Sequence, residues 1–281
     1  MSVAANPPSA ADLERWRAHI GRSESRHQIL DLESLRRYAV SVGASPEVER
    51  TLPALAHWAF FVETVEPSML GSDGHPRRGL GILPPVSLER RMFAGSSILF
   101  NAPLEINRPA TLTLTVRNVE HKAGSSGHLV FVELHRVLSQ DGVQRVAEQQ
   151  TILYRDRAAP IDPVVSSGRA SEPGEEWVPS SVDLFRFSAS TFNAHRIHYD
   201  LRYARDQEGY PDLVVQGPLT AAKLYAFSQC RSQKPLTGFR FRLLAPLFVN
   251  QPVWLRAQPD DGSVEAVRCD GVVAVSARAV V

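Results

Sequence analysis

The chain has 281 residues, of which 43% are hydrophobic and 22% are charged, and its formal net charge is +1. The length suits two domains of ordinary size, and the composition is typical of a globular protein. Nucleic acids and anionic membrane surfaces attract proteins with a clear basic excess, which this chain lacks. We therefore expect neither nucleic acid nor membrane among its partners.

The chain carries no recognisable targeting or membrane segment. Its start, MSVAANPPSAADLERW, lacks the basic residues and apolar block of a secretory signal. No apolar run approaches the ~20 residues that span a bilayer. Cys230 and Cys269 are the only cysteines, too few for a disulfide framework and not at metal-ligand spacing. We expect a cytoplasmic protein with reduced thiols.

The first half of the chain is predicted to form a helix followed by antiparallel strands. DLESLRRYAVSVG (31–43) repeats apolar residues at helical spacing, begins at the capping residue Asp31 and ends at Gly43. A proline-punctuated loop follows over about 64–88. Alternating apolar and polar residues, separated by the turn sequences KAGSSG and QDGV, then predict strands at 112–119, 129–138 and 145–155.

The second half repeats this plan after a linker. Residues 157–180 hold four prolines, two glycines and four serines, a composition typical of linkers. A strand at 182–190 is predicted to lead into a loop at 191–200. The helix predicted at 217–230 is apolar on most sides, which indicates that it is buried. Three or four strands follow, within 238–245, 252–259, 264–270 and 272–281, with Asp-Gly turns between the last of them.

These elements predict an α+β fold in which strongly curved antiparallel sheets wrap around helices, a double hot-dog. Two such units side by side could share one continuous sheet. We place the N-terminal unit at 1–156, the linker at 157–180 and the C-terminal unit at 181–281.

The loop FNAHRIHYD (192–200) allows two kinds of chemistry. His195, His198 and Asp200 offer imidazole and carboxylate groups that can bind zinc or iron. However, metallohydrolases space two histidines at i and i+4 around a glutamate, and in an extended loop residues i and i+3 point to opposite sides. We therefore expect no metal and favour acid–base chemistry.

Acid–base chemistry fits the loop because the pKa of histidine lies near neutrality, so His198 can both take and give a proton. Asn193 adds an amide that can hold a water molecule or a substrate oxygen. VVQGPL (214–219) opens the buried helix, and Gly217 there presents free N–H groups and the positive end of the helix dipole. Such groups can polarise a thioester carbonyl and stabilise the enolate formed beside it.

The same residues resemble a known family. FSASTFNAHRIHYDLRYA, followed by EGYPDLVVQGPL, resembles the active-site segment of MaoC-like dehydratases and (R)-specific enoyl-CoA hydratases, whose motif is Ser/Thr-Gly-Asp-x-Asn-Pro-hydrophobic-His. The motif histidine falls on His198. The sequence of this motif is more similar to a subgroup that contains hydroxyacyl-thioester dehydratase type 2 and the mesaconyl-C4-CoA and itaconyl-CoA hydratases. IGRSESR, AHWAFF, RRMFAGSSILF and KAGSSGHLVFVELHR extend this resemblance over the first half.

The resemblance implies a double hot-dog enzyme with a catalytic C-terminal half and a non-catalytic N-terminal half. Two positions depart from the family pattern. Asn193 stands where the family carries a catalytic aspartate and cannot act as a base, and Gln216 stands where a histidine often precedes the helix glycine. A carboxylate–histidine dyad is therefore not carried over, and His198 must do most of the proton transfer.

The reaction that these residues favour is reversible addition of water to the α,β double bond of an acyl-CoA. Gly217 would polarise the thioester, Asn193 and His198 would hold one water molecule, and His198 would take its proton. A short dicarboxylic acyl group such as mesaconyl or itaconyl would need an arginine for its distal carboxylate. The candidate substrate-binding residues, for this carboxylate, the CoA phosphates or the acyl pocket, are Arg90, Arg91, Arg196, Tyr199 and Arg202.

Three alternatives stay open from the sequence. The chain could be a 3-hydroxyacyl-thioester dehydratase of fatty-acid metabolism, an acyl-CoA thioesterase, or a non-catalytic acyl-CoA-binding protein. A thioesterase would need a carboxylate to activate water, and Asn193 argues against one at the obvious position. We expect no cofactor, because CoA is part of the substrate, and we expect a homodimer, because hot-dog proteins commonly pair.

Overall fold

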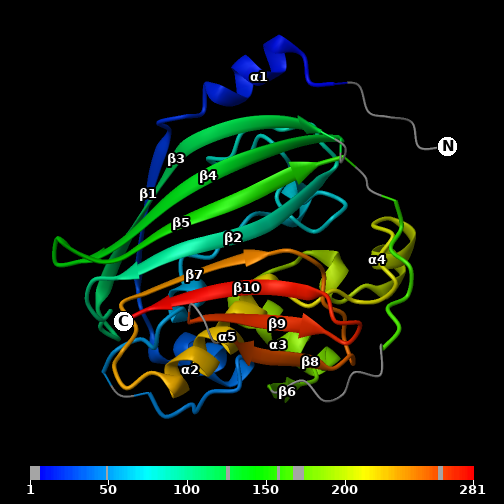
Figure 1. The fold of residues 1–281 in the computed structure, drawn as a ribbon. Helices are drawn as coiled ribbons and strands as arrows, with labels where there is room; N and C mark the ends of the chain where they lie inside the picture. Colours follow the sequence, from blue (N-terminus) through cyan, green and yellow to red (C-terminus); the bar gives the residue numbers. More distant parts are fainter. Residues whose placement is uncertain (1–6, 49, 125–126, 157–158, 167–173, 259–261) are drawn as a thin grey trace.

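The computed structural model describes residues 7–48, 50–124, 127–156, 159–166, 174–258 and 262–281. Its main feature is one antiparallel ten-stranded sheet with strand order β1-β3-β4-β5-β2-β7-β10-β9-β8-β6. The sheet is strongly curved, and most helices lie on the side of the C-terminal strands, as Figure 1 shows. The two halves of the chain therefore share one continuous sheet, as the sequence predicts.

The N-terminal half supplies five neighbouring strands of this sheet. Its elements are α1 (Ala10–Arg17), β1 (Ser23–Ile29), α2 (Leu32–Ser41), η1 (Ala56–Ala59), η2 (Pro67–Met69), β2 (Arg90–Phe100), β3 (Pro109–Gly124), β4 (Gly127–Gln140) and β5 (Val143–Arg155). The helix predicted at 31–43 and the three predicted strands are confirmed. The QDGV turn is confirmed as well, since Asp141 and Gly142 have φ values of 50° and 75°. The turn predicted in KAGSSG includes residues 125–126, which lie outside the described residues.

The C-terminal half supplies the other five strands and the buried helix. Its elements are β6 (Glu175–Trp177), α3 (Ser181–Thr191), η3 (Arg196–His198), α4 (Leu201–Asp206), α5 (Gly217–Arg231), β7 (Gly238–Leu243), β8 (Val253–Ala257), β9 (Ser263–Arg268) and β10 (Val273–Val280). The helix predicted at 217–230 and the four strands after it are confirmed. Within the range predicted as a linker, β6 pairs with β8 at one edge of the sheet.

The strand predicted at 182–190 is wrong, because these residues form the helix α3. Apolar residues in VDLFRFSAS alternate like those of a strand, but Leu184 and Phe187 also lie one helical turn apart. Both are buried, at 0% and 2% exposure. Ser180 and Asp183 form a capping box, in which each side chain binds the other's backbone N–H. The cap fixes a helix start, which the alternation alone does not reveal.

The seam between the halves lies where β2 pairs with β7. Ser96 to Leu99 of β2 run antiparallel to Phe241 to Gly238 of β7. Ile98 of β2 and Phe239 and Phe241 of β7 belong to one core cluster that contains residues from both halves. The helix α5 packs against β7, β9 and β10, and α2 packs against α3 and η1. This arrangement confirms the double hot-dog, whereas the domain boundaries stay a prediction.

None of the helices in the described part of the chain is both long and apolar enough to cross a membrane.

Candidate active site

His198 lies at the end of η3 and is buried, with 8% of its surface exposed. One hydrogen bond to the backbone fixes the orientation of its ring. Its Nδ1 lies 2.7 Å from the backbone oxygen of Val214. Because a carbonyl oxygen can only accept a hydrogen bond, Nδ1 must carry the hydrogen. Nε2 therefore keeps its lone pair, which is what a proton acceptor needs.

The surroundings of His198 hold it neutral. Burial is the main effect that lowers the pKa of His198, to about 3, and the nearby His195 and His75 act in the same direction. The hydrogen bond to Val214 opposes this shift without cancelling it. At neutral pH the ring is therefore an uncharged base.

Three histidine rings meet at this site. The centroid of the His195 ring lies 5.5 Å from that of His198, with the rings edge to face. The centroid of the His75 ring lies 4.3 Å from that of His195. His75 comes from the loop between η2 and β2, which belongs to the N-terminal half of the chain. The local sequence motif indicates His195 and His198, but nothing in it indicates His75.

Two carboxylates bind this histidine cluster from outside the FNAHRIHYD loop. Asp73 Oδ2 lies 3.2 Å from Nδ1 of His75, and Glu208 Oε1 lies 4.0 Å from Nε2 of His195. The pKa of Asp73 is lowered overall. Burial acts to raise it, but the hydrogen bond and the charge of His75 outweigh that effect. Asp73 thus comes from the other half of the chain, whereas Glu208 follows the loop by eight residues.

Asn193 supports the loop itself. Its side-chain oxygen accepts a hydrogen bond from the backbone N–H of His195 at 3.0 Å, which forms a turn typical of asparagine. Asp200 likewise caps α4, accepting from the N–H of Tyr203 at 3.0 Å. The structure records no contact of Asn193 with His198 within the described residues. Its predicted role in holding water stays a prediction.

Gly217 begins α5 three residues after the carbonyl of Val214 that binds His198, so the helix N-terminus lies near the ring. The first N–H groups of a helix have no partner within it. Gln216 is fully buried, and its amide donates to Leu184 O and Ser188 Oγ, both at 2.9 Å, which ties α3 to the start of α5. Gln216 therefore anchors the helix on the side of α3.

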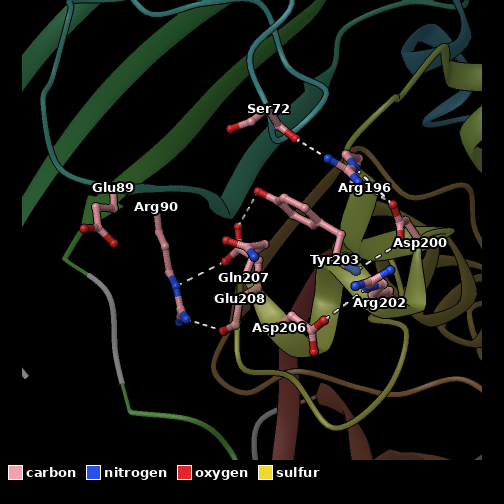
Figure 2. A pocket seen from close by; sticks show the side chains of 10 residues that line it. All are labelled: Ser72, Glu89, Arg90, Arg196, Asp200, Arg202, Tyr203, Asp206, Gln207 and Glu208. Carbon is pink, nitrogen blue, oxygen red and sulfur yellow. Dashed lines mark hydrogen bonds and ion pairs between the residues drawn. The ribbon is translucent and has the colours of Figure 1, made fainter.

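A cavity of about 560 Å³ opens beside the histidine cluster. It is lined by Ser72, Glu89, Arg90, Arg196, Asp200, Arg202, Tyr203, Asp206, Gln207 and Glu208. Figure 2 shows that loops of both halves contribute to it, with Ser72, Glu89 and Arg90 facing the α4 region. Three of the predicted substrate-binding arginines are therefore brought to one cavity.

These arginines differ in how strongly the protein holds them. Arg90 is buried to 7% exposure and forms an ion pair with Glu208, Nε to Oε2, at 3.2 Å. Arg196 forms an ion pair with Asp200 at 2.6 Å and donates to Ser72 O at 3.0 Å. The Arg202 side chain is 90% exposed, and its Nε lies 3.5 Å from Asp206. Arg202 is thus the most available of the three for a ligand.

The other two predicted substrate-binding residues lie outside the lining of this cavity. Arg91 is half-buried, and its positive charge lowers the pKa of both Asp73 and His75 in addition to larger effects. Arg91 therefore lies close to the histidine cluster. Tyr199 is 53% exposed, and its hydroxyl donates to the backbone oxygen of Ala194 at 3.1 Å.

Within the described ranges, no group of three or more histidine, cysteine, aspartate or glutamate side chains is arranged to hold a metal ion. The His195 ring contacts the rings of His75 and His198, and ring nitrogens of the cluster lie beside two carboxylates and a backbone carbonyl.

A double hot-dog sheet with a buried neutral histidine beside a helix N-terminus defines a class of hydro-lyases that act on acyl thioesters. The family model described as hydroxyacyl-thioester dehydratase type 2 matches residues 55–249. The chain belongs to this family. It is also similar to the mesaconyl-C4-CoA hydratase of Chloroflexus aurantiacus, with 41% identity over 277 residues, which cover 96% of this chain and 98% of the relative.

Solved structures agree on the fold. A MaoC-like dehydratase from Phytophthora capsici superposes with a TM-score of 0.60 at 15% identity, covering 96% of this chain and 97% of the other. A conserved hypothetical protein from Mycobacterium tuberculosis with a double hot-dog fold superposes with a TM-score of 0.51 at 12% identity, covering 92% and 95%. The predicted resemblance and fold class are therefore confirmed, as is the enzyme class, a hydro-lyase.

Proposed function

We propose that the protein catalyses the reversible hydration of a short-chain, dicarboxylic enoyl-CoA, of the mesaconyl-CoA or itaconyl-CoA type, to the 3-hydroxyacyl-CoA. The observation that carries this proposal is His198, a buried neutral imidazole with its Nδ1 bonded to Val214 O and its Nε2 left as a base. The mesaconyl-C4-CoA hydratase, similar over nearly the whole chain, supports the substrate class.

In this mechanism the thioester carbonyl binds at the N-terminus of α5, next to Gly217. The N–H groups and the helix dipole draw electrons away from Cβ and stabilise the enolate that forms. His198 Nε2 accepts a proton from water as the water oxygen bonds to Cβ. The same proton then passes from His198 to Cα, so that one water molecule is added in total.

The distal carboxylate of the acyl group calls for a positive charge close to the histidine cluster. Arg91 supports this role, because its charge acts on Asp73 and His75. Arg202 supports a different role, since its exposed guanidinium lines the mouth of the cavity and suits the CoA phosphates. Arg90 and Arg196 line the cavity and are held in place by ion pairs with Glu208 and Asp200.

One second function has a specific observation in its favour. The matching family model carries the description of a hydroxyacyl-thioester dehydratase, which supports a fatty-acid 3-hydroxyacyl-thioester as the substrate. The chemistry at His198 would be the same in the direction of water loss. The two functions differ in the acyl chain, so a substrate series separates them. The homodimer and the cytoplasmic location expected from the sequence stay predictions.

A panel of mesaconyl-C4-CoA, itaconyl-CoA, crotonyl-CoA and a long-chain 2-enoyl-CoA tests the proposal. Hydration removes the absorbance of the conjugated enoyl group without releasing free thiol, whereas a thioesterase releases thiol. We expect a kcat/KM at least about tenfold higher for the dicarboxylic esters than for crotonyl-CoA, because one carboxylate–arginine pair contributes about 1.5–3 kcal/mol. A preference for the long-chain ester would support the fatty-acid dehydratase instead.

A further inference from the structure

The loop of residues 70–79 reaches from the N-terminal half onto the loop that carries His198. The backbone N–H of Arg196 donates to Asp73 O at 2.9 Å, and Arg196 Nη1 donates to Ser72 O at 3.0 Å. Gly74, with φ of +88°, lies so close that a Cβ added there would come within 1.9 Å of Ala194 O. This loop is therefore docked on the active-site loop and delivers Asp73 and His75 to it.

Asp73 fixes the orientation of the His75 ring. Its Oδ1 accepts from the backbone N–H of His75 at 3.0 Å, and its Oδ2 lies 3.2 Å from Nδ1 of the ring. A carboxylate accepts hydrogen bonds, so Nδ1 of His75 carries the hydrogen and Nε2 keeps its lone pair. His198 has the same arrangement, with Val214 O in place of the carboxylate. The site thus holds two imidazoles, each with its Nε2 left as an acceptor.

We propose that His75 is a second catalytic residue of the hydration reaction, which accepts a hydrogen bond from the attacking water beside His198, and that Asp73 is its positioning residue. This inference rests on the proposed function and deepens it. Asn193 is engaged within its own loop, where its side-chain oxygen accepts a hydrogen bond from the backbone N–H of His195. An acceptor for the water is therefore supplied by the other half of the chain.

The step balances with one water molecule. Water donates one hydrogen to Nε2 of His75 and the other to Nε2 of His198. As the oxygen bonds to Cβ, the O–H bond facing His198 breaks, its proton moves to His198, and the π electrons move into the thioester enolate. His198 then gives that proton to Cα. The O–H bond facing His75 stays intact and becomes the 3-hydroxyl group, so His75 aims the water oxygen without changing its own protonation state.

The charges around His75 agree with an acceptor that stays neutral. Burial is the main effect that lowers the pKa of His75, to about 4, and the charges of His195 and Arg91 lower it as well. Asp73 opposes this shift through its hydrogen bond and its charge. Glu208, the remaining carboxylate of the cluster, has its Oε1 4.0 Å from Nε2 of His195. At neutral pH the ring of His75 is therefore uncharged and can accept a hydrogen bond.

The test compares substitutions of His75 in the full chain, with the hydrated substrate identified from the panel above. His75→Leu removes the acceptor that aims the water, and we expect kcat to fall about 100-fold, as for a misplaced reacting group, with KM unchanged within about threefold. His75→Gln replaces the imidazole by an amide oxygen that can accept the same bond from a shifted position. It should recover about tenfold of this loss, so that kcat stays about tenfold below that of the wild type. Asp73→Leu should resemble His75→Leu, because the ring is no longer held.

His128→Leu is the matched control, since His128 pairs with His121 at 3.0 Å in the β3–β4 hairpin and does not line the cavity. Wild-type kcat in the control together with a slow, folded His75→Leu supports the proposal. If His75→Leu keeps wild-type kcat while His198→Ala is inactive, the role of His75 is overturned and the proposed function stands. If His75→Leu fails to fold by circular dichroism, the folded His75→Gln decides, since an unchanged kcat there overturns the proposal and a lowered kcat with unchanged KM supports it. A wild-type protein that hydrates no ester of the panel overturns both.

Discussion

A single hydrogen bond decides what His198 can do. Val214 O accepts from Nδ1, which selects the tautomer with a basic Nε2, and burial keeps that tautomer uncharged. A histidine exposed to water has a pKa of about 6.5, so part of the population would be protonated near neutral pH. The protonated ring cannot accept a proton. The protein thus maintains a base at neutral pH by excluding water and by orienting the ring.

The lowered pKa of His198 has a consequence for stability. The unfolded chain binds a proton at His198 below its ordinary pKa of 6.5, whereas the folded chain does not until about 3. Folding is therefore favoured fully above 6.5, and this contribution is lost as the pH falls from 6.5 toward 3. In the variant His198→Gln the unfolded state binds no proton at this position. Its free energy of unfolding therefore does not fall for this reason as the pH is lowered.

We expect the free energy of unfolding of the wild type to fall, relative to that of His198→Gln, by about 2 kcal/mol between about pH 7.5 and about pH 5. Urea unfolding of both proteins at the two pH values, followed by circular dichroism, measures this difference. A difference between the two proteins that is the same at both pH values would mean that His198 titrates normally in the folded state.

The residues of the site differ in how far the sequence could predict them. His198 and Gly217 were found because their spacing within 192–219 is local and resembles a family motif. His75 and Asp73 were missed because they lie more than 100 residues earlier, in a loop whose composition indicates only turns. The positive φ of Gly74 and its contact with Ala194 O arise from tertiary structure, and nothing in the local sequence reports that contact.

Among the elements, the loop of residues 70–79 contributes most to the assembly of the histidine cluster. It contributes two side chains to the cluster and is held there by backbone contacts with Arg196. Its approach depends on the absence of a side chain at Gly74. The function of this loop therefore depends on its docking, in addition to the chemistry of His75.

We expect Gly74→Ala to lower kcat by about 10- to 100-fold, because the added methyl group would displace the loop from Ala194 and misplace reacting groups by ångströms. Gly142→Ala is the matched control. Gly142 also has a positive φ, +75°, but an added Cβ would meet nothing within 4 Å there. Both substitutions introduce backbone strain of about 1–2 kcal/mol, and Gly74→Ala adds the clash with Ala194 O, so the larger loss of stability is expected there.

Steady-state kinetics and thermal unfolding of the two variants test this expectation. Equal kcat values for both variants would contradict the docking of the 70–79 loop as a requirement for activity.

The helix α3 shows how an element can be assigned incorrectly. Its sequence satisfies both a strand pattern and a helix pattern, because apolar residues two and three positions apart are both present. The Ser180–Asp183 capping box is the local signal that separates the two. By contrast α2, α5 and the strands after α5 were predicted correctly because their patterns are unambiguous.

At the scale of the whole molecule, the two halves form one structure. The β2–β7 pairing joins their strands, and the same core cluster contains Ile98 from one half and Phe239 from the other. The cluster of His75, His195 and His198 is also assembled from both halves. The seam that stabilises the fold and the loop that completes the site therefore depend on the same arrangement of the halves.

We expect thermal or urea unfolding of the full chain to show a single transition, because separating the halves would expose the shared core. Far-UV circular dichroism reports the sheet, and tryptophan fluorescence reports Trp16 and Trp58 in one half and Trp177 and Trp254 in the other. Coincident transitions by both probes are the expected result. Two separate transitions would show that the halves unfold independently and that the seam contributes little.

The most direct test of the central claim is the rate at which the purified protein removes the enoyl absorbance of mesaconyl-C4-CoA, measured beside its His198→Ala variant at neutral pH. We expect hydration by the wild type without thiol release, and a loss of at least about 100-fold in kcat in the variant, which should still bind the ester. A folded His198→Ala variant with wild-type turnover would contradict this claim.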